Sequence, residues 1–213
     1  MTDIVMMKNV TKRFGTETVL KQVNLSMQEG KITGIVGRNG SGKTVLMKCL
    51  TGFLIPEEGD VQVFGKRIGK DIDFAPDTGI LIETPGFIDT ESGISNLKYL
   101  QKLKKTESAL SPADAMTLVG LDPRNKKPVG KYSLGMRQRL GLAQAMMDRP
   151  KLLILDEHMN GLDNKGVEEM RKLLLSLKEE GTAILLASHN PLDIEALCDE
   201  VYSMDQGFLT KEM

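Results

Sequence analysis

One short run of residues has the types and spacing needed to bind a chain of phosphates. It matches the phosphate-binding P-loop pattern, G-x-x-x-x-G-K-[ST], and consists of Gly37, Arg38, Asn39, Gly40, Ser41, Gly42, Lys43 and Thr44. Glycines allow backbone N–H groups to wrap phosphate oxygens at a helix N-terminus. Lys43 is expected to neutralise the β and γ oxygens, and Thr44 to offer a hydroxyl to Mg²⁺. The segment therefore predicts a site for a nucleotide with Mg²⁺.

A pair of acidic residues follows an apolar run further along the chain. Leu152–Leu155 is apolar and ends in Asp156 and Glu157. Asp156 suits a Mg²⁺ ligand, usually through water, and Glu157 suits a base that polarises the water attacking a γ-phosphate. An apolar run ended by two acids is also common at a surface, but here it accompanies a P-loop. The two motifs together leave several nucleotide-binding classes open, including kinases, helicases and small GTPases.

A third motif narrows these classes. The segment Tyr132–Arg139, here called the signature segment, reads Tyr-Ser-Leu-Gly-Met-Arg-Gln-Arg. Ser133 can cap a helix that runs through Met136, and Gly135 carries no side chain, so the helix N-terminus could clamp a γ-phosphate. Taken alone, the segment would be an ordinary capped helix. Placed shortly before the acidic pair, it resembles the signature of ABC ATPases, whose commonest form is Leu-Ser-Gly-Gly-Gln.

The resemblance to ABC ATPases covers almost the whole chain and implies further site residues. Phe14 stands where the family stacks an aromatic ring on adenine, Asn160–Asp163 resembles the D-loop, and His189 resembles the switch histidine at the γ-phosphate. Taken alone, each of these residues is weaker evidence for an ATP site, since a single aromatic is more often a core residue and His189 could be a loop histidine. The resemblance also implies ATP and Mg²⁺ as cofactors, a self-dimer in which the P-loop of one copy faces Ser133–Met136 of the other, and an integral membrane permease subunit as a partner.

Departures from the common family pattern point to a subgroup. Glu83 takes the place of a glutamine, and we expect it to be a metal-linked coupling residue, the alternative being a solvated acid. His158-Met159 replaces the usual Pro-Thr. The chain resembles the bacitracin-resistance and lantibiotic-immunity exporters in three segments, namely Gly79–Phe87, the signature segment and Glu195–Asp199. Many members of this subgroup extend well past the end of this chain, so we expect an accessory C-terminal segment, and regulation through it, to be absent.

The elements that would carry these motifs alternate between strands and helices. Buried strands are predicted at Ile32–Val36, Leu152–Leu155 and Ala183–Ala187, each accompanied by helical patterns. This order predicts a parallel sheet with helices on its faces and ligands at the carboxyl ends of the strands. We therefore expect an α/β fold with the parallel-sheet core of a P-loop NTPase (RecA-like).

Two additions to this core are expected. Ile4–Val10 and Thr18–Met27 alternate in polarity and are separated by turn residues, so they predict an N-terminal antiparallel β-subdomain. Helical patterns over Asn96–Lys105 and Pro112–Val119, followed by the helix capped by Ser133, predict an inserted α-helical subdomain over approximately residues 88–148. Residues 1–213 are expected to form a single ABC-type ATP-binding domain.

Composition limits the partners and the location. The 28 basic and 29 acidic side chains of the 213-residue chain nearly cancel, which disfavours nucleic acid as a partner. Cys49 and Cys198 lack metal-ligand spacing and are expected to be buried, inert thiols. Since no run approaches the roughly 18 apolar residues of a membrane span, we expect a cytoplasmic protein that binds peripherally to the cytoplasmic face of the cell membrane.

The leading interpretation is an ATP-hydrolysing subunit of an ABC transporter that exports an antimicrobial peptide or other amphiphile through a separate membrane subunit. A cytosolic ABC ATPase that acts as an assembly or scaffold factor without transport is the alternative. A slowly hydrolysing regulator is suggested only by the unusual Glu83 and His158, and the presence of Glu157 argues against it. Handling of double-stranded DNA is disfavoured, because the chain has no room for long coiled-coil inserts.

Overall fold

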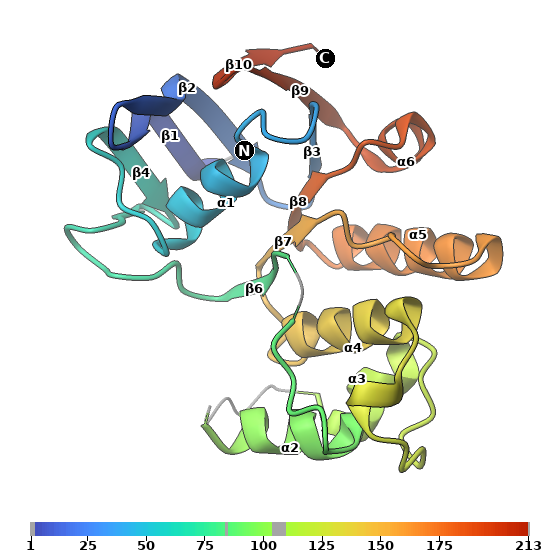
Figure 1. The fold of residues 1–213 in the computed structure, drawn as a ribbon. Helices are drawn as coiled ribbons and strands as arrows, with labels where there is room; N and C mark the ends of the chain where they lie inside the picture. The colour runs from blue at the N-terminus through green and yellow to red at the C-terminus, as the bar shows by residue number, and fades with distance from the viewer. Residues whose placement is uncertain (1–2, 84, 104–109, 213) are drawn as a thin grey trace.

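Two β-sheets lie on either side of one helix, α1 (Figure 1). The computed structural model describes residues 3–83, 85–103 and 110–212. The first sheet is antiparallel, with the order β2-β1-β4-β5, and its strands are β1 (Asp3–Phe14), β2 (Glu17–Gln28), β4 (Glu58–Val63) and β5 (Lys66–Arg67). The register of β1 against β2 shifts at several points, as at β-bulges.

The second sheet carries most of the predicted chemistry. Its order is β10-β9-β3-β8-β7-β6, and every strand in it is parallel to its neighbours except β10. The strands are β3 (Ile32–Val36), β6 (Thr78–Leu81), β7 (Leu152–Asp156), β8 (Ala183–Ala187), β9 (Glu200–Asp205) and β10 (Phe208–Lys211). Because β8 lies between β3 and β7, the carboxyl ends of these three strands meet at one edge of the sheet.

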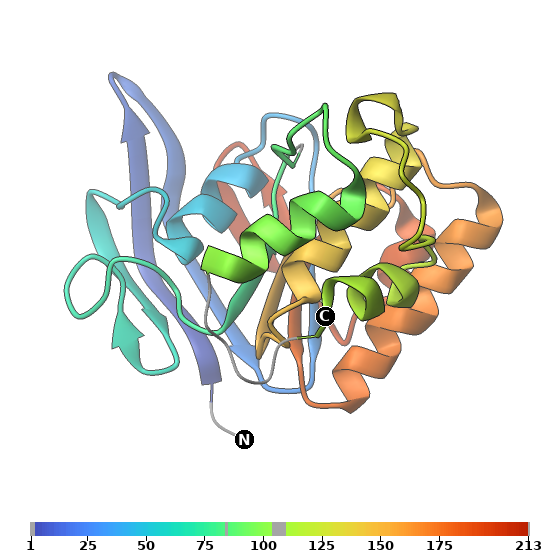
Figure 2. The same ribbon diagram turned by 90° about the horizontal axis from the view of Figure 1, so that it is seen from below.

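The helices surround the second sheet and form a group at one end. They are α1 (Lys43–Thr51), α2 (Gly93–Leu103), α3 (Pro112–Leu118), α4 (Leu134–Met146), α5 (Asn164–Glu179) and α6 (Pro191–Leu197), with a short 3₁₀ turn at Val129–Lys131. Figure 1 shows α2, α3 and α4 grouped away from the antiparallel sheet. Figure 2, turned by 90°, shows the β1–β2 hairpin and α5 on opposite sides of the molecule.

Burial on both faces of the second sheet explains its unbroken apolar strands. Leu152 and Ile154 of β7 pack in a core with α1 and the antiparallel sheet. Leu153 and Leu155 point the other way, into a core formed with α4 and α5. All four side chains are fully buried, and each contributes about 1.5–3 kcal/mol relative to exposure. This two-sided packing fixes the end of β7, where the chain reaches Asp156.

The fold class expected from the sequence is confirmed. The parallel-sheet core, the N-terminal antiparallel sheet and a group of helices between β6 and β7 are all present. Strands β1 and β2 extend beyond Ile4–Val10 and Thr18–Met27, whereas α6, β9 and β10 were not predicted. The end of the helix expected at Asn96–Lys105 lies outside the described residues. The limits of a separate helical subdomain at 88–148 stay a prediction, because α4 also packs against β6 of the sheet.

The two cysteines differ in burial. Cys49 is buried on α1 as expected, but Cys198 is only half-buried, so that part of the prediction was wrong. Cys198 Sγ packs against Gly34, since a Cβ atom there would lie 2.7 Å from it. Burial raises the pKa of both thiols to about 12, which makes them poor nucleophiles at neutral pH. In the part of the chain that the structure describes, no helix is long and apolar enough to cross a membrane.

Candidate active site

The P-loop connects the end of β3 to the start of α1. Gly37 allows a close backbone approach, because a Cβ atom there would lie 2.4 Å from the carbonyl oxygen of Met204. Gly42 caps α1 with a φ of 113°, a conformation that favours glycine. Lys43 is the first residue of α1, so this cationic residue lies at the N-terminus of the helix. Backbone N–H groups and one cation are therefore in place here that could bind an anion.

The Lys43 ammonium group is turned back onto the loop. Its Nζ donates hydrogen bonds to the carbonyl oxygens of Gly37 at 2.8 Å and Arg38 at 3.1 Å, and the residue is buried. The Ser41 hydroxyl is also buried, and its oxygen has no partner among the described residues. Buried polar atoms are normally hydrogen-bonded, so this hydroxyl fits a site completed by a ligand with oxygen acceptors, such as phosphate.

The acidic pair lies beside the P-loop. Thr44 Oγ1 donates a 2.7 Å hydrogen bond to Asp156 Oδ2, which joins α1 to the end of β7 across the sheet. Burial raises the pKa of the Asp156 carboxyl, and the hydrogen bond from Thr44 partly opposes this. The charges of Glu157 and Glu83 raise the same pKa further, whereas that of Lys43 lowers it. A carboxylate in this environment would be stabilised by a bound cation.

Glu157 is held by contacts from two other segments. Its φ is 47°, and its backbone N–H donates to the carbonyl oxygen of Ala187 at 3.0 Å. Asn160 Nδ2 donates to Glu157 Oε2 at 2.8 Å, and His189 Nδ1 lies 3.3 Å from Glu157 Oε1. The structure thus brings His189, which follows β8, to the acidic pair that ends β7. Asn160 was expected only as part of the D-loop, and its contact with Glu157 was not predicted.

Phe14 lies at the end of β1 and is 47% exposed, so it is not a core residue. The Lys12 ammonium group lies 5.4 Å from the centroid of its ring, at a cation–π distance. Lys12 is itself held by a 2.6 Å hydrogen bond to Glu57. The exposed ring borders the same cavity as the P-loop, which is the place expected for an adenine platform.

Glu83 follows β6 and pairs with a lysine of α1. Its Oε1 accepts a 2.9 Å hydrogen bond from Lys48 Nζ, and its side chain is 63% exposed. Its φ of 60° lies in the left-handed region, an uncommon conformation for a glutamate. The carboxylate borders the P-loop cavity and also a second cavity between α1, β6, α2 and α4. Glu83 was expected near the metal, but its pairing with Lys48 was not predicted.

These groups surround one cavity of about 740 Å³. Among the expected site residues, the cavity is lined by Phe14, Asn39, Gly40, Gly42, Lys43, Thr44, Glu83, Asp156 and Glu157. Residues that were not predicted individually complete the lining, namely Glu17, Val19 and Val45, with Leu134 and Gln138 of the signature segment and Asn160 of the D-loop. The expected residues that do not line it are Gly37, Arg38, Ser41, Ser133, Gly135, Met136, Asp163 and His189. Most of the P-loop and both acids therefore meet in one place, and most of the signature segment does not.

The signature segment begins α4 and packs against the D-loop. Ser133 caps α4 as predicted, since its Oγ accepts the backbone N–H of Met136 at 3.2 Å. A Cβ atom on Gly135 would lie 2.7 Å from the carbonyl oxygen of Gly161, so glycine is required for this contact. Asp163 caps α5 by accepting the backbone N–H of Gly166 at 2.8 Å. The start of α4 and the start of α5 are therefore packed together.

His158 is the site residue whose setting the sequence could not indicate. It is 3% exposed, and neither ring nitrogen has a partner among the described residues. Burial lowers its pKa to about 4, and the charge of Asp193 opposes this shift. The imidazole is therefore neutral at pH 7.

Comparison with known proteins agrees with this geometry. The family model described as ABC transporter matches residues 20–160, about two thirds of the chain. The bacitracin transport ATP-binding protein BcrA of Enterococcus faecalis is 42% identical over 208 residues, which cover 97% of this chain and 68% of that protein. The lantibiotic transport ATP-binding protein SrtF of Streptococcus pyogenes is 37% identical over 206 residues, which cover 96% of this chain and 88% of that protein.

A solved structure shows the same fold. The dimeric structure of the ATP-binding cassette MJ0796 with ADP and Pi superposes with a TM-score of 0.85 at 24% identity, and covers 98% of this chain and 97% of that chain. The similarity to transport ATP-binding proteins confirms the expected subgroup and favours transport over the scaffold alternative. The chain belongs to the ABC transporter family, as an ATP-binding subunit that hydrolyses ATP.

Proposed function

We propose that two copies of this chain bind ATP between them, with the P-loop of one copy facing the signature segment of the other. The cavity that gathers Lys43, Asp156 and Glu157 is the observation that carries the proposal. Leu134 and Gln138 of the signature segment line the cavity of their own chain. Ser133, Gly135 and Met136 do not line it, which supports the use of these three residues by a second copy. The cassette MJ0796, which has the same fold, is described as dimeric, and this supports a dimer of the present chain.

Mg²⁺ is proposed to bind at Thr44 and Asp156. The hydroxyl and the carboxylate are already 2.7 Å apart, and both offer the oxygen ligands that Mg²⁺ prefers. The raised pKa of Asp156 supports this site, because a cation would offset the cost of burying the charged carboxylate. Glu83 would join through a metal-bound water once its carboxylate leaves Lys48. Bound Mg²⁺ would neutralise charge that develops on the phosphates.

Lys43 is proposed to exchange its partners when ATP binds. Its ammonium group now donates to two loop carbonyl oxygens, which offer a weaker attraction than phosphate. Phosphate oxygens at the N-terminus of α1 would accept these hydrogen bonds instead and would also accept from the backbone N–H groups. Phe14 would stack its exposed ring on the adenine.

Glu157 and His189 are proposed to carry the hydrolytic step. Glu157 Oε1 would accept the hydrogen bond of the attacking water, and would thereby orient it in line with the γ-phosphate. His189, 3.3 Å from that oxygen, would donate a hydrogen bond to the γ-phosphate. Asn160 holds the other carboxylate oxygen of Glu157 and so limits its rotation.

An integral membrane subunit is proposed to dock at the second cavity. This cavity has a volume of about 510 Å³ and lies between α1, β6, α2 and α4. Phe53 and Leu103 line it and are 53% and 82% exposed, respectively, so it offers apolar contact for a helix of that subunit. Glu83 lines both cavities, which supports a role in linking ATP to the membrane subunit. By similarity to BcrA and SrtF, the transported substrate is proposed to be a peptide antibiotic.

Coexpression in a sensitive bacterium tests the transport proposal. The chain would be expressed with a candidate membrane subunit, and growth would be measured against bacitracin and a lantibiotic. Resistance to one of them is expected with the unmodified chain and not with Lys43→Ala. If the two proteins assemble in the membrane and hydrolyse ATP but confer no resistance to either compound, the proposed substrate class is wrong.

A further inference from the structure

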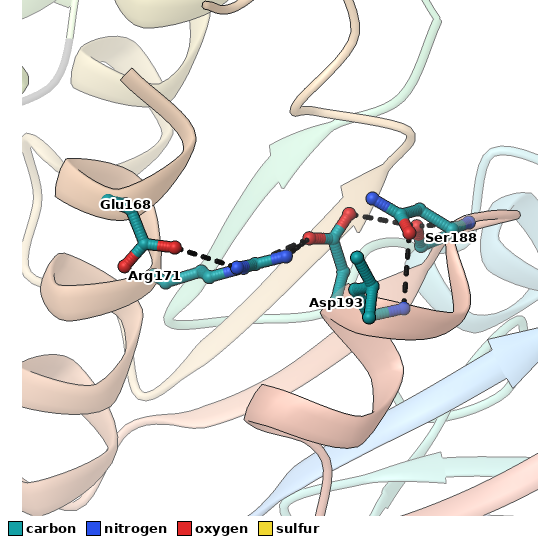
Figure 3. A network of polar contacts seen from close by, with 6 residues as sticks. Glu168, Arg171, Ser188 and Asp193 are labelled. Carbon is teal, nitrogen blue, oxygen red and sulfur yellow. Dashed lines mark hydrogen bonds and ion pairs between the residues drawn. The ribbon is translucent and has the colours of Figure 1, made fainter. Parts of the chain in front are cut away.

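A buried ion pair joins α5 to the start of α6 (Figure 3). Asp193 is only 3% exposed, and its Oδ1 accepts hydrogen bonds from Arg171 Nη2 at 2.6 Å and Nε at 3.1 Å. Arg171 Nη1 donates to Glu168 Oε1 at 2.8 Å on the outer side of α5. The guanidinium group is therefore held in one orientation, and it donates two hydrogen bonds to a single oxygen of the Asp193 carboxylate.

The other oxygen of Asp193 faces the loop that carries His189. Ser188 Oγ donates to Asp193 Oδ2 at 3.4 Å, and the same hydroxyl accepts the backbone N–H of Asn190 at 3.1 Å (Figure 3). Asn190 then caps α6 by accepting the backbone N–H of Leu192 at 3.1 Å. Both neighbours of His189 in the sequence thus belong to the network that ends on Asp193.

Packing alone does not fix this loop against Glu157. The His189 side chain is 61% exposed. A cavity of about 220 Å³ lies between the loop and the segment that follows Glu157, and it is lined by His158, Ser188 and Asp193 among others. Close-packed side chains normally hold a catalytic group in place, but here a cavity lies where such side chains would be. The position of His189 must therefore come from hydrogen bonds.

The ion pair is not needed to dock α6. Replacing a buried ion pair with apolar side chains of similar volume is often neutral or stabilising. A buried charge on Asp193 is thus a poor means of gaining stability alone. The pair instead connects the loop to α5, whose 16 residues include the buried Met170 and Leu174 and provide a firm anchor. By contrast, α6 has only 7 residues, and its buried apolar side chains Ile194 and Leu197 can dock it without the pair.

We propose that Asp193, held by Arg171, is a positioning residue for His189. The pair fixes the loop from Ser188 to Asn190 so that the imidazole stays beside Glu157. This inference rests on the catalytic role proposed above for His189. It assigns the ion pair a function in hydrolysis, although neither of its side chains lines the P-loop cavity.

The test removes the pair without leaving a buried charge. In the double variant Arg171→Met/Asp193→Leu, kcat for ATP is expected to fall by about 10- to 100-fold, the effect of displacing a catalytic group by roughly 1 Å. KM for ATP and the thermal midpoint should stay close to the unmodified values. Lys178→Met is the matched control, because Lys178 also pairs with an aspartate near α6, Asp199, but at the far end of the helix. It should leave kcat unchanged.

A second comparison separates positioning from a general structural effect. If the pair acts through His189, the double change should lower kcat no further in a His189→Ala background. An unchanged kcat in the double variant, or an equal fall with and without His189, would overturn the inference. A normal kcat for His189→Ala alone would show instead that the proposed catalytic role of His189 is wrong. If the double variant does not fold, Asp193→Asn, which keeps the volume, replaces it in the same comparisons.

Discussion

Replacing His158 with leucine should change how the stability of the protein depends on pH. Burial lowers the pKa of His158 from 6.5 to about 4 in the folded chain. Above pH 6.5 the imidazole is neutral in both the folded and the unfolded states, so it adds no pH dependence there. Below that pH the unfolded chain binds a proton that the folded chain excludes. The free energy of unfolding therefore falls as the pH drops from 6.5 towards 4.

The size of this effect follows from the difference between the two pKa values. Each pKa unit corresponds to about 1.36 kcal/mol, so the loss reaches about 2 kcal/mol at pH 5 and about 3 kcal/mol at pH 4. For a chain of 213 residues, a loss of about 2 kcal/mol lowers the thermal midpoint by roughly 4–8 °C. Leucine is a suitable replacement because neither ring nitrogen has a partner among the described residues, so no hydrogen bond to them is lost.

Thermal unfolding at pH 7 and pH 5 provides the measurement. The unmodified protein should lose roughly 4–8 °C more between these values than His158→Leu loses. The only other histidine is His189, which is exposed, and His189→Leu is the matched control. Because it retains His158, this control should keep the larger loss. Equal losses in the unmodified protein and His158→Leu would refute the assignment of a buried, neutral imidazole.

Substitutions at three further residues test separate parts of the site. Lys43→Ala should abolish hydrolysis and greatly weaken ATP binding, because the P-loop loses the cation that faces the β and γ phosphates; unchanged phosphate release would contradict the P-loop interpretation. Glu83→Gln should largely preserve ATPase activity, whereas Glu83→Ala should impair resistance in cells more than ATP binding; if both stay normal, Glu83 is only a solvated acid. Gly135→Ala places a Cβ atom 2.7 Å from the carbonyl oxygen of Gly161, so ATP hydrolysis should fall by about tenfold or more. Gly86→Ala is its control, since a Cβ atom there meets nothing within 4 Å, and equal activity of the two variants would show that the Gly135 contact does not matter.

The central part of the fold was predictable because its strands are buried on both faces. The apolar runs of β3, β7 and β8 need no alternation. Strand β7 ends at the motif residue Asp156, whereas β3 and β8 end one and two residues before Gly37 and His189, respectively. Strand boundaries in the antiparallel sheet were harder to predict, since register shifts in β1 interrupt the alternation of polar and apolar residues. The strand β9 mixes polar and apolar residues in a parallel sheet, so its sequence gives no clear signal of its place beside β3.

The candidate site was predictable only where local sequence carries the information. A P-loop and two acids at strand ends must meet if the strands share one parallel sheet, as Thr44 and Asp156 do. The pairing of Arg171 with Asp193 depends on how α5 and α6 lie in space, and in the sequence both look like ordinary surface charges. The burial of His158 has the same cause, because it arises from contacts in the folded chain and not from the residues beside it in the sequence.

The most direct measurement of the central claim is the mass of Glu157→Gln in solution. This variant should bind ATP but hydrolyse it roughly 10² to 10⁴ times more slowly, the effect of losing a general base. Light scattering with ATP and Mg²⁺ should then show a dimer, whereas ADP with Mg²⁺ should leave a monomer. The additional change Lys43→Ala should prevent the dimer. Monomers of Glu157→Gln under saturating ATP and Mg²⁺ would contradict an ATP site shared between two copies.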